Sequence, residues 1–288
     1  MQKSVLNSPR LLELKKKRRI TLMRKIFFII FLLFLVLVGL SFLSKWENFN
    51  ISDIEISGNK IIETKVIEDV VKENISGNYF WFFPKTNFLF YPQNKIEIEL
   101  KDKFKRIKNV FVNDKNIKTL SVLVEERTAL YTYCGVAVDL VPELQNQKCY
   151  FIDEDGYIFD EAPYFSGGIY LKFYGVVDNN EENPSGSYFF PSYFKKLITL
   201  KETLNKIGIK PVAFSIEDNK DVNVFLSFSS TQIGPKIIFK LDSDFEKIIE
   251  NLQSVLTTEP LQSDFKNKYN SLIYIDLRFG NKVYYKFK

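Results

Sequence analysis

The sequence predicts an α+β protein in which a single N-terminal transmembrane helix precedes two folded domains. Three observations predict this class. Residues 26–44 form a run of 19 residues without a charge. Residues 48–126 open with a strand and a helix and close with two strands, whereas residues 127–288 read as mostly antiparallel β-structure interrupted by two helices. Because 45% of the 288 residues are apolar, both domains have the material for a core.

The uncharged run, IFFIIFLLFLVLVGLSFLS, is long enough to cross a membrane as a helix. At about 1.5 Å per residue it covers most of a hydrocarbon core of roughly 30 Å. A cleaved signal peptide is the alternative, since Gly39-Leu40-Ser41 offers a small-x-small cleavage site. The long segment before the run and its continuation to Leu43 favour a retained span.

The charges of the chain are divided unevenly between its ends. Residues 1–25 hold nine basic side chains and one acidic one, a net charge of +8, and the remaining 263 residues carry −3. A basic segment beside a span predicts a cytoplasmic N-terminus, which leaves residues 45–288 outside the cytoplasm. Binding of the tail to anionic lipid or nucleic acid is the alternative. The acidic balance of the body argues against a nucleic-acid partner.

The chain contains no histidine, which removes several catalytic classes. Ser-His-Asp catalysis, His-ligated zinc and histidine pH switches all need an imidazole. The sequence also lacks a Walker A motif, a GxGxxG motif and a GxSxG motif. Paired carboxylates such as Glu125-Glu126 read as surface clusters. We therefore expect no enzyme activity, no cofactor, no metal site and no small-molecule substrate.

Cys134 and Cys149 are the only two cysteines, 15 residues apart, each at the edge of a strand-like run. In an oxidising compartment a disulfide would stabilise the loop by up to about 3 kcal/mol. Two buried, unpaired thiols are the alternative. Two cysteines are too few for a structural zinc site.

Residues 48–126 carry a pattern of short elements. The expected strand 49–56 is half-buried, with Ile54 and Ile56 on one face, and Gly58-Asn59 ends it with a turn. Apolar spacing of three and four predicts an amphipathic helix over 62–75 with Thr64 near its start. The other expected elements are an ambiguous segment at 92–104, which fits strand and helix alike, and strands at 107–112 and 120–125.

The segment Tyr79 to Tyr91, YFWFFPKTNFLFY, is rich in aromatic residues. It could lie on the membrane surface, form a partner site or pack beneath the helices. Packing is the favoured interpretation.

Within residues 127–288, a hairpin is expected over Cys149 to Phe159, with its turn at Asp155-Gly156. The acidic run Asp153 to Asp155 is too short for an EF-hand and reads as a polar turn. Helices are expected from Tyr193 to Ile207 and from Phe245 to Val255, the latter with the capping-box pair Ser243 and Glu246. Further strands are expected at 212–216, 222–228, 236–241, 271–277 and 283–287.

Several short motifs in a fixed order resemble the FtsQ/DivIB family of bacterial cell-division proteins, which carry a POTRA-type domain. They follow a basic tail and one span. The matching residues are Phe49, Ile51, Ile54, Ile56, Gly58 and Asn59; Leu120 to Arg127 with Ala129; Phe151-Ile152-Asp153 with Gly156 and Phe159; and Tyr274-Ile275-Asp276-Leu277-Arg278-Phe279. The chain departs from the family at Thr128, where the family has proline, in its long aromatic segment and in its two cysteines.

The resemblance implies a domain plan and a function. Residues 1–25 would be the cytoplasmic tail, 26–44 the span, 48–126 a POTRA domain of order β-α-α-β-β, and 127–288 the β domain. The protein would be a non-enzymatic scaffold of the divisome, at the septum of the cell membrane. It would bind the single-span proteins FtsB and FtsL outside the membrane and help recruit septal peptidoglycan synthesis.

The last strands suggest how such partners bind. Val283, Tyr285 and Phe287 alternate with Lys282, Tyr284, Lys286 and Lys288, so one face can cover the core while the strand edge stays open. An open edge accepts a partner strand through its main chain. The expected partner-binding residues are Tyr274, Lys282, Tyr284, Tyr285 and Lys286. Protection of the edge against aggregation is the alternative role of these lysines.

Two other functions remain open. A POTRA-bearing protein of outer-membrane assembly or secretion is one, although such proteins continue into a long alternating β-barrel that this sequence does not display. A wall-modifying enzyme is the other, disfavoured by the missing nucleophile and base. Localisation at midcell in dividing cells would distinguish the scaffold from both.

Overall fold

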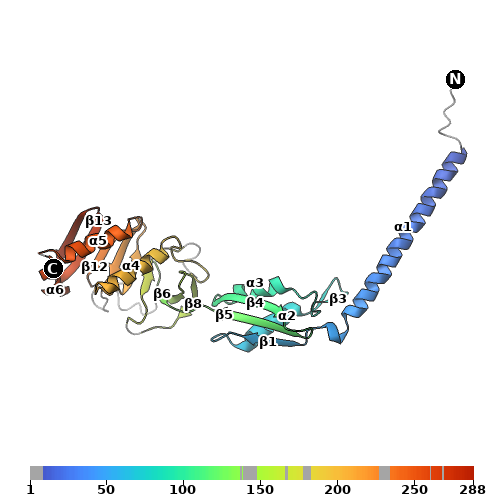
Figure 1. The fold of residues 1–288 in the computed structure, drawn as a ribbon, viewed down its shortest axis with the longest axis horizontal. Helices are drawn as coiled ribbons and strands as arrows, with labels where there is room; N and C mark the ends of the chain where they lie inside the picture. Colours follow the sequence, from blue (N-terminus) through green and yellow to red (C-terminus); the bar gives the residue numbers. More distant parts are fainter. Residues whose placement is uncertain are drawn as a thin grey trace, which may run out of the picture. The chain divides into compact units, whose positions relative to one another are not determined.

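The computed structural model shows a mixed α+β protein (Figure 1). The structure describes residues 9–136, 138, 148–165, 168–177, 183–226, 234–259, 261–267 and 269–288. The chain divides into two compact units, 1–126 and 127–288, each with its own hydrophobic core.

One long helix, α1 (Pro9–Ser44), contains both the basic segment and the uncharged run. It is the one helix of the described chain that is long and apolar enough to cross a membrane. Its large apolar side chains between Ile26 and Leu43 are 40–82% exposed, so no other part of the described chain covers them. A soluble core helix would bury these side chains, so α1 is not a core helix of the described chain.

The rest of the first unit is a three-stranded sheet of order β1-β5-β4, with β1 parallel to β5 and β4 antiparallel to it. The elements are η2 (Glu47–Phe49), β1 (Asp53–Ser57), α2 (Thr64–Ile75), α3 (Gln93–Lys103), β4 (Ile107–Asp114) and β5 (Thr119–Glu126). Apolar side chains of α2 and α3 pack with Val110, Val112 and Val122 of the sheet. The expected strand 49–56 starts later, because residues 47–49 form a 3-10 turn.

The ambiguous segment 92–104 is a helix, α3. Ile96 and Leu100 are fully buried, whereas Ile98 is 62% exposed. A spacing of four between the buried residues fits a helix that faces the core, and it excludes the alternating strand in which all three would share one face.

The aromatic segment contradicts the prediction that it packs beneath the helices. It folds as a small hairpin of β2 (Asn78–Tyr79) and β3 (Phe83–Pro84) whose tip is exposed. Phe80 and Trp81 are 88% and 89% exposed. Only the C-terminal part of the segment, at Phe88 and Tyr91, packs against the core. Phe80 and Trp81 have φ values of 45° and 68°, a left-handed conformation that costs a non-glycine residue about 1–2 kcal/mol.

The second unit is built on a nine-stranded mixed sheet of order β14-β13-β12-β11-β10-β9-β6-β7-β8, in which antiparallel pairs outnumber parallel ones. Its strands are β6 (Tyr131–Tyr133), β7 (Cys149–Ile152), β8 (Ile158–Ala162), β9 (Lys172–Tyr174), β10 (Ala213–Ile216), β11 (Asp221–Phe225), β12 (Lys236–Lys240), β13 (Leu272–Phe279) and β14 (Lys282–Phe287). The expected strand 222–228 extends past Leu226 into residues outside the described ranges.

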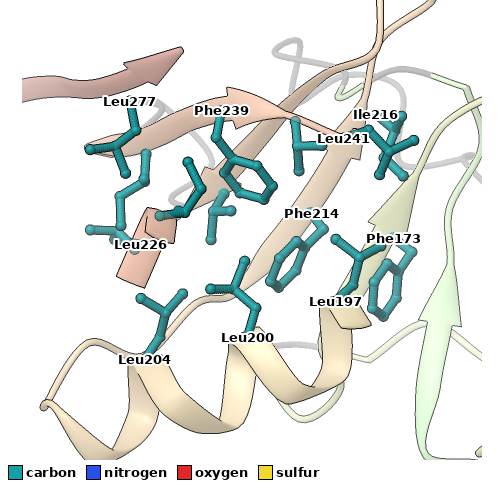
Figure 2. Packing of buried hydrophobic residues seen from close by; sticks show 14 of the residues in the cluster. Phe173, Leu197, Leu200, Leu204, Phe214, Ile216, Leu226, Phe239, Leu241 and Leu277 are labelled. Atoms are coloured by element: carbon teal, nitrogen blue, oxygen red, sulfur yellow. The ribbon is translucent and has the colours of Figure 1, made fainter. Parts of the chain in front are cut away.

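Three helices in the described part of this unit, rather than the two expected, pack on this sheet and bury its core, because the segment after α5 forms a further short helix. They are α4 (Phe194–Lys206), α5 (Phe245–Leu256) and α6 (Leu261–Asn267), followed by the 3-10 turn η3 (Tyr269–Ser271). Figure 2 shows Leu197, Leu200 and Leu204 of α4 directed at the sheet side chains Phe173 and Phe214. The helices α5 and α6 also form the crossover that lets β13 pair in parallel with β12.

The start of α5 corrects the predicted cap. Asp244, rather than Ser243, is the N-cap residue, because its carboxylate accepts hydrogen bonds from the backbone N–H groups of Glu246 and Lys247. Both residue types cap helices well, and the sequence offers them side by side.

The boundary between the units lies between Glu126 and Arg127, and each side chain binds its own unit. The Glu126 carboxylate accepts backbone hydrogen bonds from Lys60, Ile61 and Ile62 at 2.7–3.1 Å. Arg127 forms an ion pair with Asp153 of the β7–β8 hairpin.

Candidate functional site

The strand β14 forms one end of the nine-stranded sheet. It pairs antiparallel with β13, and in the described part of the chain no strand pairs with its other side. A terminal strand of this kind exposes a row of main-chain donors and acceptors that another strand can use.

The register of β13 and β14 brings the predicted partner-binding residues together. Tyr274 lies opposite Lys286, and Asp276 lies opposite Tyr284. Because paired residues point to the same side of a sheet, Tyr274, Tyr284 and Lys286 share one face. Tyr285 lies opposite the buried Ile275 and therefore on the other face.

The face toward the helices is only partly closed at this edge. Val283 and Phe287 pack against the core, in agreement with the predicted alternation. Tyr285 is on the same face but remains 36% exposed, with its ring 5.9 Å from that of Phe287. Tyr285 is therefore available to a partner from the core side of the strand, and Tyr284, at 49% exposure, from the opposite side.

One residue of the site was not predicted. Phe279, at the end of β13, is 55% exposed, and its ring meets that of Tyr284 edge-on at 5.2 Å. Phe279 also pairs with Lys282 across the β13–β14 turn. An exposed phenylalanine at the end of an alternating strand is the signal that identifies it. Phe279 and Tyr284 together form an aromatic patch beside the open edge.

A cluster of charged groups holds β13 in place behind this patch. Arg278 bonds Asp276 through Nε and Nη2, at 2.9 and 2.6 Å, and bonds Asp221 of β11 through Nη1 at 2.6 Å. Lys240 of β12 pairs with the other Asp221 oxygen at 2.6 Å. The network links three neighbouring strands, and the two carboxylates are buried.

The charges of this cluster are stabilised by their partners. Burial by itself raises the pKa of Asp221, but hydrogen bonds from Lys240 and Arg278 outweigh burial and hold the pKa below its ordinary value of 3.8. The hydrogen bond to Asp276 raises the pKa of Arg278. Both shifts favour the charged forms of Asp221 and Arg278, and the Asp-Leu-Arg sequence has a structural role here.

The open edge carries positive charge. Lys282 and Lys286 are exposed on β14, and Lys288 follows it. Lys236 of β12 lies beside Tyr274. In the described part of the chain no carboxylate forms an ion pair with Lys282 or Lys286. An extended segment with acidic side chains would complement this edge.

The cysteines lie away from this site. A disulfide joins Cys134, which follows β6, to Cys149 at the start of β7, with the Cα atoms 4.2 Å apart. The strands β6 and β7 lie near the opposite end of the sheet order from β14. The disulfide links β6 to β7 and lies outside the candidate site.

The polar turn at Asp153 is likewise structural. The Asp153 carboxylate accepts hydrogen bonds from the backbone of Asp155 and Tyr157 and pairs with Arg127, whose guanidinium lies 3.8 Å from the centre of the Tyr157 ring. Within the described ranges, no group of three or more metal-binding side chains is present.

Three Ser-x-x-Lys spacings, which serine acyl-transfer enzymes use, begin at Ser57, Ser192 and Ser263. Ser57 and Lys60 are both exposed, without the burial that a catalytic pair needs. At Ser192 to Lys195 the lysine side chain is 78% exposed and pairs with Asp155 at 3.3 Å. An activated nucleophile needs a neighbouring base in a buried site, whereas this lysine is exposed and paired with a carboxylate. At Ser263, which begins the third spacing, the hydroxyl donates to Glu259 at 2.6 Å.

No protein-family model matches this chain. No curated protein matches it either.

Proposed function

We propose that the protein is a non-enzymatic, single-span scaffold of the bacterial divisome, of the FtsQ/DivIB type. The observation that carries the proposal is the open edge of β14, with Tyr274, Phe279, Tyr284 and Lys286 around it, in a unit that follows a helix able to span a membrane. Such an edge has the form of a surface for a protein segment.

The first unit supports the proposal through its chain order. Its main elements run β1, α2, α3, β4, β5, which is the β-α-α-β-β order expected of a POTRA domain. Two of the sequence motifs that resemble the family fall on these elements: the opening motif runs into β1, and Glu126 of the Glu-Arg pair is the last residue of β5.

The basic residues before the span support a cytoplasmic N-terminus. Both folded units then lie outside the cytoplasm, at the septum of the cell membrane. There the divisome proteins FtsB and FtsL would be the partners, and the protein would help to recruit septal peptidoglycan synthesis.

The binding step we propose is strand addition. A partner segment pairs with the outer edge of β14 through main-chain hydrogen bonds, which supply affinity. Tyr274 and Tyr284 contact it from one face and Tyr285 from the other, while Lys282 and Lys286 select acidic side chains. The charge cluster behind β13 keeps the edge rigid before binding.

The test is co-purification of the full chain with co-expressed FtsB in detergent. Tyr284→Pro should abolish co-purification, because proline removes a backbone donor and disturbs strand pairing at the open edge. Circular dichroism before and after the change checks that the protein stays folded. Undiminished FtsB binding by a folded Tyr284→Pro protein would refute strand addition.

If proline unfolds the strand, a double charge variant and its matched control test the same edge. Lys282→Glu/Lys286→Glu should weaken FtsB binding at least tenfold, because two favourable charges become repulsive. The matched control is Lys196→Glu/Lys210→Glu, which makes the same charge change at exposed positions on α4 and in the loop after it. Equal binding by the two double variants would contradict the assigned edge.

A further inference from the structure

The exposed tip of the β2–β3 hairpin is not used by the proposed partner site. Phe80, Trp81 and Phe82 are 88%, 89% and 52% exposed, and Leu89 and Phe90, further along the same segment, are 69% and 48% exposed. This is a cluster of large apolar side chains in a short stretch of chain, which a soluble surface rarely carries without a partner.

The hairpin is attached to the end of the membrane-spanning helix. The Ser41 hydroxyl, in the last turn of α1, donates to the Phe82 carbonyl at 2.8 Å. The side-chain amides of Asn50 and Asn87 donate to the Ser44 carbonyl at 3.1 Å each, which satisfies a carbonyl that a helix end leaves unpaired. Ser41, Ser44 and Asn87 are all buried in this junction. Figure 1 shows β3 beside the end of α1, in agreement with their contact.

This attachment sets the depth of the hairpin in a membrane. The uncharged run ends at Ser44, so Ser41 lies about 4.5 Å inside the end of the run, at about 1.5 Å per residue. Phe82, bonded to Ser41, is held at the same depth. That depth is the boundary between headgroups and acyl chains, where aromatic side chains concentrate in membrane proteins.

The backbone of the tip points to the same role. Phe80 and Trp81 adopt positive φ, which glycine or asparagine would adopt with less strain. Neither burial in the protein nor backbone preference explains two large aromatic residues at these positions. A lipid interface does, because it gives both rings an apolar environment outside the protein.

Two cations belong to the segments that join at the hairpin, the end of α1 and β3. Lys45 follows the span directly and is exposed, and Lys85 follows β3 with its ammonium 5.7 Å from the centre of the Tyr79 ring. Lysines at this depth extend toward lipid phosphates. The arrangement of an apolar tip and two cations is that of a monotopic membrane anchor.

We propose that the tip of the β2–β3 hairpin, at Phe80, Trp81 and Phe82, inserts into the interface of the membrane that α1 spans. The hairpin is then a second membrane contact that ties the first unit to the bilayer surface. The inference depends on α1 being in a membrane and is independent of the divisome role.

The experiment uses the full chain in phosphatidylcholine vesicles. Trp46→Phe leaves Trp81 as the single tryptophan, since the chain has two. The control carries Trp46→Phe, Trp81→Phe and Phe111→Trp, which places the tryptophan at an exposed site on β4 away from the hairpin. Flotation of the vesicles selects chains that α1 anchors.

Lipids brominated near the headgroup should quench Trp81 more strongly than lipids brominated near the chain ends, and aqueous iodide should quench it weakly. The tryptophan introduced by Phe111→Trp should be quenched strongly by aqueous iodide and by neither brominated lipid. Trp81 quenched by iodide as strongly as the control, with no quenching by either brominated lipid, would overturn the proposal. The vesicles hold no partner protein. A failure of the FtsB co-purification test would therefore not change the quenching result.

Discussion

At the scale of single residues, Glu126 and Arg127 are adjacent in the chain but bind different units. Glu126 closes the turn after β1 through three backbone N–H groups, and Arg127 pairs with Asp153 of the β7–β8 hairpin. The Glu-Arg pair that contributed to the family resemblance therefore has a local physical reason. Glu126, at the end of the first unit, is bonded within that unit, and Arg127, at the start of the second, is bonded within the second.

Glu126 provides a stability test with a definite pH dependence. Burial by itself raises the pKa of Glu126, but the backbone hydrogen bonds from Lys60, Ile62 and Ile61 outweigh it and lower the pKa below the ordinary 4.5. A lowered pKa means that the folded state favours the charged carboxylate. Its stabilisation is therefore complete above pH 4.5 and is lost as the pH falls through the folded pKa.

Glu126→Gln should lower the free energy of unfolding of the first unit by about 1–2 kcal/mol at pH 7, because a neutral amide bonds the three donors more weakly. Amide hydrogen exchange of β5 in the detergent-solubilised full chain measures the change. The matched control is Glu125→Gln, an exposed neighbour that bonds only Asn109 in the described structure. Equal exchange in both variants would show that the turn does not depend on this carboxylate.

At the scale of elements, the disulfide has a separable effect. It joins the end of β6 to the start of β7 across 15 residues of sequence. In the loop-closure model a loop of this length contributes about 3 kcal/mol. Because the bond lies within the second unit, its loss should leave the first unit unchanged.

Cys134→Ala/Cys149→Ala should lower the free energy of unfolding of the second unit by up to about 3 kcal/mol. Urea titration of the full chain, followed by hydrogen exchange in each unit, measures both units in one sample. Thiol alkylation of the unfolded, unreduced wild type checks the bond itself. Two alkylated cysteines in that sample would show that the thiols are free.

Some of the helices and strands were predictable from sequence patterns, and others were not. Helices with a clear apolar stripe, such as α2, α4 and α5, and the alternating strands β4 and β5 were predictable, because one face of each buries against a single core. The segment that became α3 was not, because Ile96, Ile98 and Leu100 alternate like a strand whereas Ile96, Leu100 and Phe104 are spaced like a helix. Only tertiary packing distinguishes the two.

The aromatic segment was predicted wrongly for a related reason. Apolar residues usually pack inside a soluble protein, but Phe80 and Trp81 lie on a strained, exposed hairpin tip beside a helix long and apolar enough to span a membrane. In the proposal made above, exposure to lipid replaces burial in protein. A sequence pattern reports the chemistry of these side chains but not the backbone that presents them.

The candidate site was predictable in part. The five residues predicted to bind a partner lie on β13 and β14, at the end of the sheet. Phe279 was missed because its exposure depends on the β13–β14 turn. The cluster of Asp221, Lys240 and Arg278 was missed because the three residues are distant in sequence and meet only through the strand order.

At the scale of the whole molecule, the proposal places membrane contacts in the N-terminal part of the chain and an open strand edge in its C-terminal part. The chain's charge of +5 conceals a basic segment at the membrane and an acidic remainder. The proposal needs no catalytic group from such a molecule. It needs an ordered edge, next to which the Arg278 cluster fixes β13, and an anchor, for which α1 is long and apolar enough.

Site-specific photocrosslinking in dividing cells tests this account most directly. A photoreactive amino acid replaces Tyr284 at the open edge and, in a parallel strain, Phe111 on the exposed face of β4 as the control. The account predicts a crosslinked adduct of this chain with FtsB from position 284 and none from position 111. Contrary results would be a position 284 that gives no adduct with FtsB, or adducts of equal yield from the two positions.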